Sequence, residues 1–333
     1  MLKCLLEFSP REVGVTSAMW IRSFTPVFLL TLGAACADAG LSSPAEDRPL
    51  GKELEKEPVK NPLPVVGPPG IYLANADGSS PARFLVEGDS PAWSPDGRSI
   101  AFDREDEIRV IQPGGATERS LSAGRDPSWS PDGTRIAFVG KEGIGVMTAE
   151  GSGATILLRH DFRNDTYAPF DMGIGGPAWS PDGERIAFQH NGDGDTVPGQ
   201  VFLMNADGTA PRRVTPTDGN QYAESHPAWS PDGSQLVFWS YWFGLVAVDP
   251  AVGGRRVIHE DFPSLNYWAF PSWSPDGRTI LFTFWQPFPQ TPAVWAVDAR
   301  GGPVRPVIAS GTHAVWSPDG TTIAFVHPGS LNP

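Results

Sequence analysis

Short apolar runs alternate with polar turns along most of the chain, and the pattern is clearest between residues 177 and 215. Four strand-length segments occur there: "PAWS" (177–180), "RIAF" (185–188), "GQVFLMN" (199–205) and "RRVT" (212–215). The tight-turn sequence "PDG" separates the first pair, and "ADG" separates the last pair. Short apolar runs bounded by such turns are typical of antiparallel strands. This unit is therefore predicted to form a four-stranded sheet.

The same unit recurs along the chain, and a tryptophan marks the equivalent point in each copy. The six positions are Trp93, Trp129, Trp179, Trp229, Trp273 and Trp316. Neighbouring copies lie 36 to 50 residues apart. Repeats of this length with four strands each favour propeller blades over a helical solenoid. The expected fold is an all-β, six-bladed β-propeller of four-stranded antiparallel blades.

The order of the segments predicts how the ring closes. The first segments, "GIYLANADG" and "ARFLV", correspond to the third and fourth strands of a blade, and the last, "AVWS" and "TTIAFV", to the first and second. The N- and C-terminal strands should therefore share one blade. Closure needs no disulfide, since both cysteines, Cys4 and Cys36, precede the repeats.

The repeated residues are best explained by architecture. In "PDG", Pro181 presets φ, Asp182 can accept bonds from its own backbone, and Gly183 adopts positive φ. Six copies of the aspartate spread around a ring cannot converge on one metal ion. Each tryptophan is expected to pack one blade against the next. The aspartates assigned this structural role are Asp96, Asp132, Asp182, Asp232, Asp276 and Asp319.

The phrase "WSPDG..IAF" followed by "MNADG" resembles the TolB-type β-propeller repeat. The resemblance covers about residues 69–333 and implies a propeller without the α/β domain that precedes it in TolB. It is specific for the fold. Because unrelated activities occur on this scaffold, it does not specify a function.

The N-terminal segment has the features of an export signal. Arg22 precedes an apolar run from Phe24 to Ala35 that is too short for a comfortable transmembrane helix. Small residues then lead to Cys36, as in a bacterial lipoprotein signal, so lipidation of Cys36 is expected. Ordinary cleavage near Ala37 or Ala39 is the alternative.

Three domains follow from these features: a signal segment (1–36), a disordered tether (37–68) and the propeller (69–333). Met19 is a candidate true start, because residues 1–18 dilute the signal pattern with charges. The tether is polar and proline-rich and cannot bury enough surface to fold. The expected location is outside the cytoplasm, in the periplasm or anchored at the outer membrane.

The net charge of −13 argues against nucleic acids and anionic membrane surfaces as main partners, because both require basic patches. Contact with the membrane is expected only through the lipid anchor. A hydrophobic share of 40% argues against disorder over most of the chain.

Long, unrepeated connections gather on one face of the blades built on Trp179, Trp229 and Trp273. They are rich in aromatic residues and contain acidic ones such as Glu224. Such a surface suits recognition of an envelope protein, peptide or glycan by a monomeric binding module. The alternative is that the rings only pack the loops. The candidate partner-binding residues are Tyr167, Phe170, Tyr222, His226, Tyr241, Trp242, Tyr267, Trp268 and Trp285.

All six histidines are expected on that same face: His160, His190, His226, His259, His313 and His327. His226 and His313, together with Asp126, occupy equivalent positions three residues before the tryptophan and should face the channel mouth. The competing hypothesis is therefore a hydrolase or lyase acting on polysaccharide through a histidine-based metal site.

No catalytic residue is assigned, because no nucleophile elbow, zinc-protease motif or phosphate-binding glycine loop is present. No cofactor is expected. "NGDGDT" places Asn191, Asp193 and Asp195 at alternate positions, as at the start of a calcium loop, but lacks the later glycine and glutamate. It is at most a weak calcium site.

Overall fold

The computed structural model describes residues 62–115, 117–159, 174–191, 199–215, 224–240, 243–260, 270–285 and 291–329. The chain divides into two compact units, 1–55 and 56–333, and every described residue belongs to the second. Every regular element within the described ranges is a β-strand. No helix there is long and apolar enough to cross a membrane.

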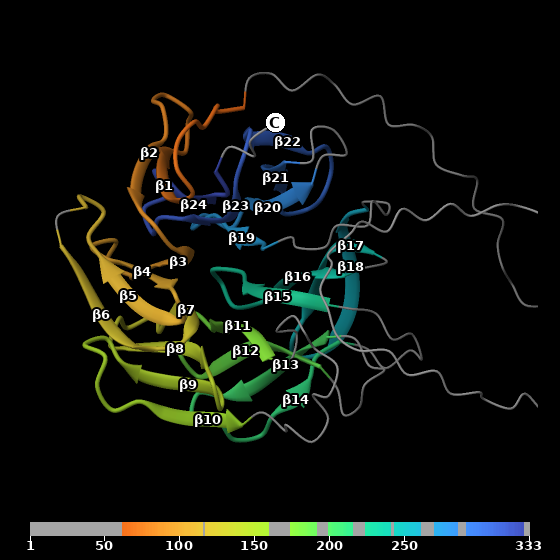
Figure 1. Cartoon of the computed structure of the whole chain (residues 1–333). Helices are drawn as coiled ribbons and strands as arrows, with labels where there is room; N and C mark the ends of the chain where they lie inside the picture. Colours follow the sequence, from red (N-terminus) through yellow and green to blue (C-terminus); the bar gives the residue numbers. More distant parts are fainter. Residues whose placement is uncertain are drawn as a thin grey trace, which may run out of the picture. The chain divides into compact units, whose positions relative to one another are not determined.

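In the described part of the chain, twenty-four strands form six four-stranded sheets (Figure 1). The first blade contains β3 (Asp89–Trp93), β4 (Ile100–Arg104), β5 (Glu107–Ile111) and β6 (Glu118–Ala123). The second contains β7 (Arg125–Trp129), β8 (Arg135–Gly140), β9 (Gly143–Thr148) and β10 (Thr155–Arg159). The third contains β11 (Ile174–Trp179), β12 (Arg185–Asn191), β13 (Gly199–Asn205) and β14 (Arg212–Arg213).

The remaining blades follow the same order. The fourth contains β15 (Glu224–Trp229), β16 (Leu236–Ser240), β17 (Gly244–Asp249) and β18 (Gly253–His259). The fifth contains β19 (Ser272–Trp273), β20 (Thr279–Trp285), β21 (Pro292–Asp298) and β22 (Arg305–Ile308). The sixth combines β23 (Thr312–Trp316) and β24 (Thr322–His327) with β1 (Gly70–Asn75) and β2 (Arg83–Val86).

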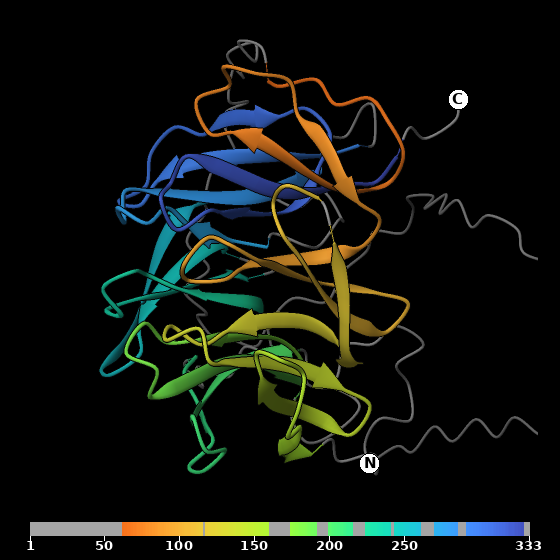
Figure 2. The same ribbon diagram turned by 90° about the vertical axis from the view of Figure 1, so that its left-hand side faces the viewer.

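The sixth blade closes the ring with both ends of the propeller. Its strand order is β2-β1-β24-β23, and β1 pairs antiparallel with β24 from Gly70↔His327 to Asn75↔Thr322. The innermost strands β3, β7, β11, β15, β19 and β23 contact one another in sequence, and β23 contacts β3 again. The blades are stacked side by side around that ring (Figure 2). The predicted fold and its shared closing blade are confirmed.

The core repeats with the blades. The second strand of each blade carries a phenylalanine that is at most 3% exposed. These six residues are Phe102, Phe138, Phe188, Phe238, Phe282 and Phe325. The clusters around them join neighbouring blades: Trp179 packs with Ala137 and Val146 of the second blade and with Phe188 of its own. Burial between blades therefore stabilises the ring as a whole.

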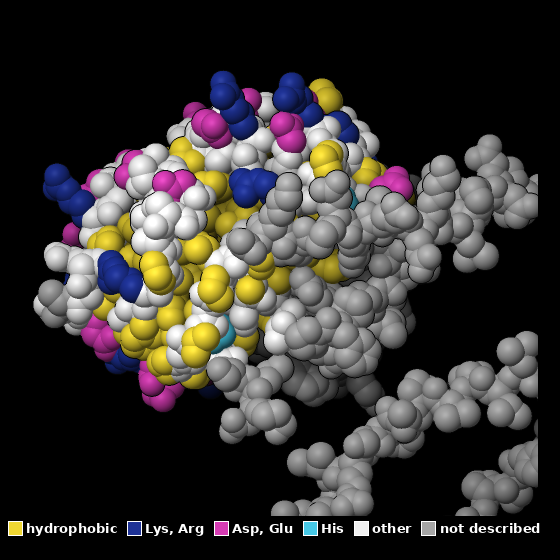
Figure 3. Space-filling view, turned by 90° about the horizontal axis from the view of Figure 1, so that it is seen from above, with side chains coloured by type: hydrophobic (Ala, Val, Ile, Leu, Met, Phe, Trp, Pro, Cys, Tyr) yellow, Lys and Arg dark blue, Asp and Glu magenta, His cyan; other side chains and the backbone are white. Residues whose placement is uncertain are grey.

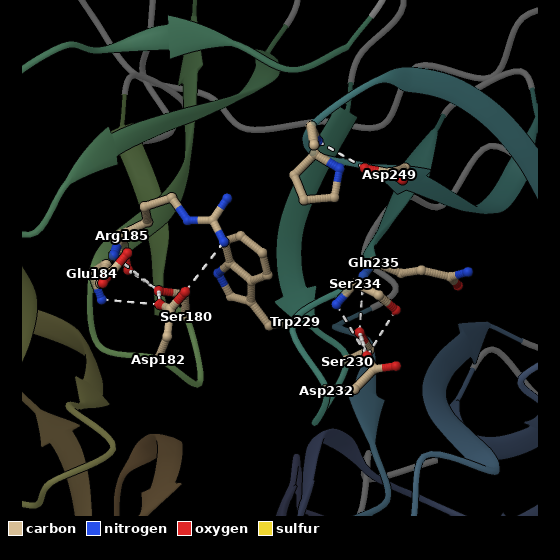
Figure 4. Close-up of polar contacts among 12 residues, drawn as sticks. Ser180, Asp182, Glu184, Arg185, Trp229, Ser230, Asp232, Ser234, Gln235 and Asp249 are labelled. Atoms are coloured by element: carbon tan, nitrogen blue, oxygen red, sulfur yellow. Dashed lines mark hydrogen bonds and ion pairs between the residues drawn. The ribbon is translucent and has the colours of Figure 1, made fainter.

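The Trp-Ser-Pro-Asp-Gly turns are tied by their own side chains (Figure 4). In the third blade the Ser180 hydroxyl donates to Asp182, which also accepts from the Glu184 N–H at 3.0 Å. The Arg185 N–H donates to the Ser180 hydroxyl at 2.9 Å, and Gly183 has φ +74°. These bonds, led by the one from Ser180, lower the pKa of Asp182. The aspartate is engaged within its own turn.

Trp229 links the third and fourth blades. Its Nε1–H donates to the Ala178 carbonyl at 3.1 Å, and the Arg185 guanidinium lies 4.9 Å from its ring centroid (Figure 4). The side chain is 8% exposed. An apolar ring with one hydrogen bond and one cation over its face is well suited to this interface.

The segment before β1 also contacts the propeller. Leu63 forms a parallel bridge with Ile308: its N–H donates to Val307 at 3.0 Å, and its carbonyl accepts from Ala309 at 3.1 Å. Residues 37–68 were expected to be a disordered tether, but at Leu63 the chain is already paired with the edge of β22. An outer strand offers unpaired backbone groups, which explains this pairing.

Two faces follow from the strand directions. The turn face carries the six Pro-Asp-Gly turns. The loop face lies at the opposite strand ends, where the innermost strands begin.

Candidate functional site

Every blade has positive φ at the same position, three residues before the tryptophan; in five blades this residue lies in the innermost strand, and in the fifth, Phe270 precedes β19. These residues have φ between +37° and +55°, which is uncommon for any residue except glycine. We call them the bulge ring: Ser90, Asp126, Gly176, His226, Phe270 and His313. Five of the six are not glycine, so each such blade accepts backbone strain at this point.

Pairing along the innermost strands slips at this residue. The register shifts between Asp89 and Ala92 in β3, and equivalent shifts occur in β7, β11, β15 and β23. A proline follows the bulge residue in five of the six blades. Because proline has no N–H to donate to a ladder, it is found at bulges. A bulge re-aims a side chain, so one repeated backbone conformation directs the five side chains of the ring; Gly176 has none.

A cavity of about 260 Å³ lies at this ring. It is lined by residues from three equivalent positions in the blades: the bulge residue, the residue before it, and the residue after the buried phenylalanine. Its lining residues are Asp89, Ser90, Asp103, Arg125, Asp126, Gly175, Gln189, His226, Phe270 and His313. We call this the ring cavity.

One side of the ring cavity is acidic. The Ser90 hydroxyl donates to Asp126 Oδ1 at 3.0 Å, and the Asp126 N–H donates to Asp103 Oδ1 at 3.1 Å. Burial, followed by the charge of Asp126, raises the pKa of Asp103 to about 6, and the Asp89 charge adds to this. Arg125 Nε lies 4.0 Å from Asp126 Oδ2. The carboxylates thus outnumber the cation near them.

The other side is aromatic. Phe270 contacts both histidines of the ring, with centroid distances of 4.2 Å to His226 and 3.4 Å to His313. Burial lowers the pKa of both imidazoles, so they are neutral at pH 7. His313 Nδ1 also lies 3.2 Å from Asp89 Oδ1, which joins the two sides.

The remaining described histidines lie apart from the ring. His190 contacts Phe202 at 5.5 Å between ring centroids, His259 contacts Phe282 at 5.9 Å, and His327 contacts Tyr72 at 5.5 Å. His160 is outside the described residues. Within the described ranges, no group of three or more His, Cys, Asp and Glu is placed to hold a metal ion.

Of the nine predicted partner-binding residues, the structure places one in the ring cavity: His226. Trp285 ends β20, and only its backbone is described. The other seven lie outside the described residues: Tyr167, Phe170, Tyr222, Tyr241, Trp242, Tyr267 and Trp268. Cys36, Asp193 and Asp195 are also outside, and Asn191 ends β12.

Glu224 does not contribute to an acidic surface. It is 1% exposed, and its Oε1 lies 2.9 Å from Arg255 Nη2. The Arg255 guanidinium also lies 4.5 Å from the Phe243 ring centroid. Burial raises the pKa of Glu224, in spite of the nearby arginine. The expectation from its position in a loop-rich sequence was wrong, because the start of β15 is covered.

Sequence reasoning found His226, His313 and Asp126 but missed Asp89, Asp103, Gln189 and the role of Phe270. The missed residues share a signal. A proline two residues before each repeated tryptophan marks the bulge in five blades, and the residue after the phenylalanine of "IAF" varies from blade to blade. Aligning the units on these two positions would have identified the cavity lining.

Comparisons with known proteins agree with this geometry. Residues 126–246 match the family model of the TolB beta propeller domain. A search of curated proteins found no match. A solved structure of putative TolB from Agrobacterium tumefaciens superposes with a TM-score of 0.63 at 20% identity, covering 78% of this chain and 98% of that one.

Two further solved structures are similar. TolB from Acinetobacter baumannii has a TM-score of 0.53 at 14% identity, covering 79% of this chain and 65% of that one. An oligogalacturonate lyase from Vibrio parahaemolyticus has a TM-score of 0.52 at 15% identity, covering 77% and 82%. At these identities the likeness concerns the fold. The chain therefore contains a TolB-like six-bladed β-propeller.

Proposed function

We propose that this protein is an exported binding module that recognises a protein, peptide or glycan partner of the cell envelope at its loop face. The observation that carries the proposal is the bulge ring. Six blades repeat one strained backbone conformation, yet present Ser, Asp, Gly, His, Phe and His at it. Structural needs alone would favour glycine at all six positions. Strain retained for different side chains supports a role in recognition.

The envelope location is supported by the signal-like segment before Cys36 and by the likeness to TolB. Lipidation of Cys36 would anchor the propeller through the segment that precedes it. Among the described residues, no group of three or more His, Cys, Asp and Glu is placed to hold a metal ion, so the histidine-based metal site of the enzyme hypothesis has no support there.

Affinity capture from an envelope extract of the source organism tests the proposal. Tagged full-length protein is compared with a variant carrying Trp242→Ala, Trp268→Ala and Trp285→Ala, all in or beside the loop-face connections. We expect the variant to lose at least one partner that the unchanged protein recovers, since aromatic residues dominate recognition surfaces.

The matched control is Arg300→Ala on the turn face, where the arginine side chain is 90% exposed. It should recover the same partners as the unchanged protein. Equal recovery by all three proteins, with unchanged thermal unfolding, would refute recognition at the loop face.

A further inference from the structure

The ring cavity is divided by charge. Asp89 and Asp103 of the first blade and Asp126 of the second form the acidic side. His226, Phe270 and His313, from the fourth to sixth blades, form the aromatic side. On the surface seen in Figure 3, by contrast, acidic and basic side chains are interspersed with hydrophobic ones. The cavity thus holds three carboxylates against the single guanidinium of Arg125, on the side opposite the aromatic rings.

A buried amide provides an independent indication of a ligand. Gln189 lines the ring cavity and is only 6% exposed, and its side chain makes no hydrogen bond to any described residue. The side chain is held among buried neighbours, while its amide opens onto the cavity. Its amide oxygen is therefore an acceptor that a ligand N–H or O–H in the cavity can reach.

The carboxylate oxygens around the cavity come from different strands and are not arranged as one two-oxygen acceptor pair. Asp89 uses Oδ1 both for the Ser90 N–H at 2.7 Å and for His313, so its Oδ2 has no hydrogen bond to a described residue. Asp126 and Asp103 present oxygens from two further strands. Single acceptors from three strands of two blades match the three spread donors of an ammonium better than the planar fork of a guanidinium.

We propose that the ring cavity binds an alkylammonium group, with its charge against Asp89, Asp103 and Asp126 and its aliphatic stem against Phe270. This rests on the proposed function, because it names the chemistry recognised at the loop face. A volume of about 260 Å³ suits one side chain, so the occupant is the end of a lysine side chain or of a free aliphatic amine. Asp89 is 52% exposed, which keeps the acidic side open to an incoming group.

Calorimetric titration of the full-length protein tests the proposal with defined probes. Nα-acetyl-lysine amide represents a protein lysine, and 1-aminopentane represents a free amine. Nα,Nε-diacetyl-lysine amide and 1-pentanol are the matched uncharged controls. We expect saturable binding of the two amines only, weakened by added salt because the attraction is between charges. Tighter binding of the lysine probe would identify a protein partner as the source, and tighter binding of 1-aminopentane a free amine.

Three variants locate the site. Asp126→Asn keeps an acceptor for Ser90 but removes a charge, Asp103→Asn removes a half-buried charge, and Gln189→Leu removes the amide. Each should weaken amine binding about tenfold or more, as loss of a charge-assisted or buried hydrogen bond does. Asp132→Asn, in a Pro-Asp-Gly turn of the opposite face, should bind as the unchanged protein does.

Three results would overturn the proposal: no saturable binding up to about 10 mM amine, equal binding of the acetylated control, or unchanged binding by all three variants. Binding of calcium or manganese chloride that amines cannot displace would also overturn it in favour of a metal site. These outcomes are separable from the proposed function. Loss of a partner by the tryptophan variant without amine binding would leave a binding module that recognises other chemistry.

Discussion

At the scale of single residues, Asp103 shows how much folding stability is lost when a carboxylate is placed in the ring cavity. Its carboxyl group is surrounded by Asp126 and Asp89 and shielded from water, and its pKa rises from the ordinary 3.8 to about 6. The folded protein therefore holds this proton more tightly than the unfolded chain does. Ionisation of Asp103 is unfavourable for folding, and stability is lost as the pH rises from about 4 to above 6.

We therefore predict that Asp103→Asn stabilises the protein while it weakens amine binding. The gain should approach 3 kcal/mol at pH 8, from a pKa difference of about 2 units, and should become small near pH 3, where the carboxyl group is mostly protonated in both the folded and the unfolded protein. Urea unfolding at the two pH values measures it. A destabilised variant at pH 8 would contradict the assigned environment of Asp103.

Asp132→Asn provides a control of opposite sign. The Ser130 hydroxyl, followed by the Thr134 N–H and hydroxyl, lowers the pKa of Asp132 to about 2. Its stabilising contribution is present above pH 3.8 and is lost as the pH falls through 2. The same Asp-to-Asn change should therefore lower stability at pH 8. The two aspartates thus differ in the sign of their contribution to stability: ionisation of Asp103 in the cavity opposes folding, and ionisation of Asp132 in the turn favours it.

At the scale of elements, the contact between neighbouring blades depends on the repeated tryptophan. Trp229 is 8% exposed, donates to Ala178 and lies under Arg185. We predict that Trp229→Ala destabilises the protein by about 3–5 kcal/mol, through lost burial and the cavity left behind. Trp229→Phe keeps most of the apolar contact and should cost about 1–2 kcal/mol. Chemical unfolding curves of both variants test this. Equal losses of stability in the two variants would show that the apolar contact of the aromatic side chain contributes little.

The strands and turns could be predicted from sequence because their causes are local. "PDG" and "ADG" define hairpins, and the "IAF" runs identify the buried second strands. The bulges were not predicted, although a proline marks them in five blades, because the residues that meet there, such as Ser90, His226 and Phe270, are far apart in the chain and are not glycines. Burial of Glu224 was missed for a similar reason: its partner, Arg255, is three strands away in the same blade.

At the scale of the whole molecule, closure brings six chain segments from residues 89 to 313 to one point. The sequence predicts that ring, because the two strands at the N-terminal end and the two at the C-terminal end can only complete one shared blade. It also predicts that His226 and His313 face the channel mouth. It did not predict that Asp89, Asp103 and Gln189 line the same cavity, because they come from two blades that are distant in sequence from His226 and His313. The aromatic connections of the third to fifth blades remain a prediction.

Ligand recognition in the ring cavity is the central proposal for this protein, and the histidines offer the most direct test of it. The imidazole signals are followed by ¹H–¹³C correlation NMR of the full-length protein during titration with Nα-acetyl-lysine amide. His226 and His313 line the cavity, whereas His190, His259 and His327 serve as internal references. We predict that the signals of His226 and His313 move together and saturate at one dissociation constant while the references stay in place. If the two signals do not move, or if only the references do, ligand recognition in the ring cavity is contradicted.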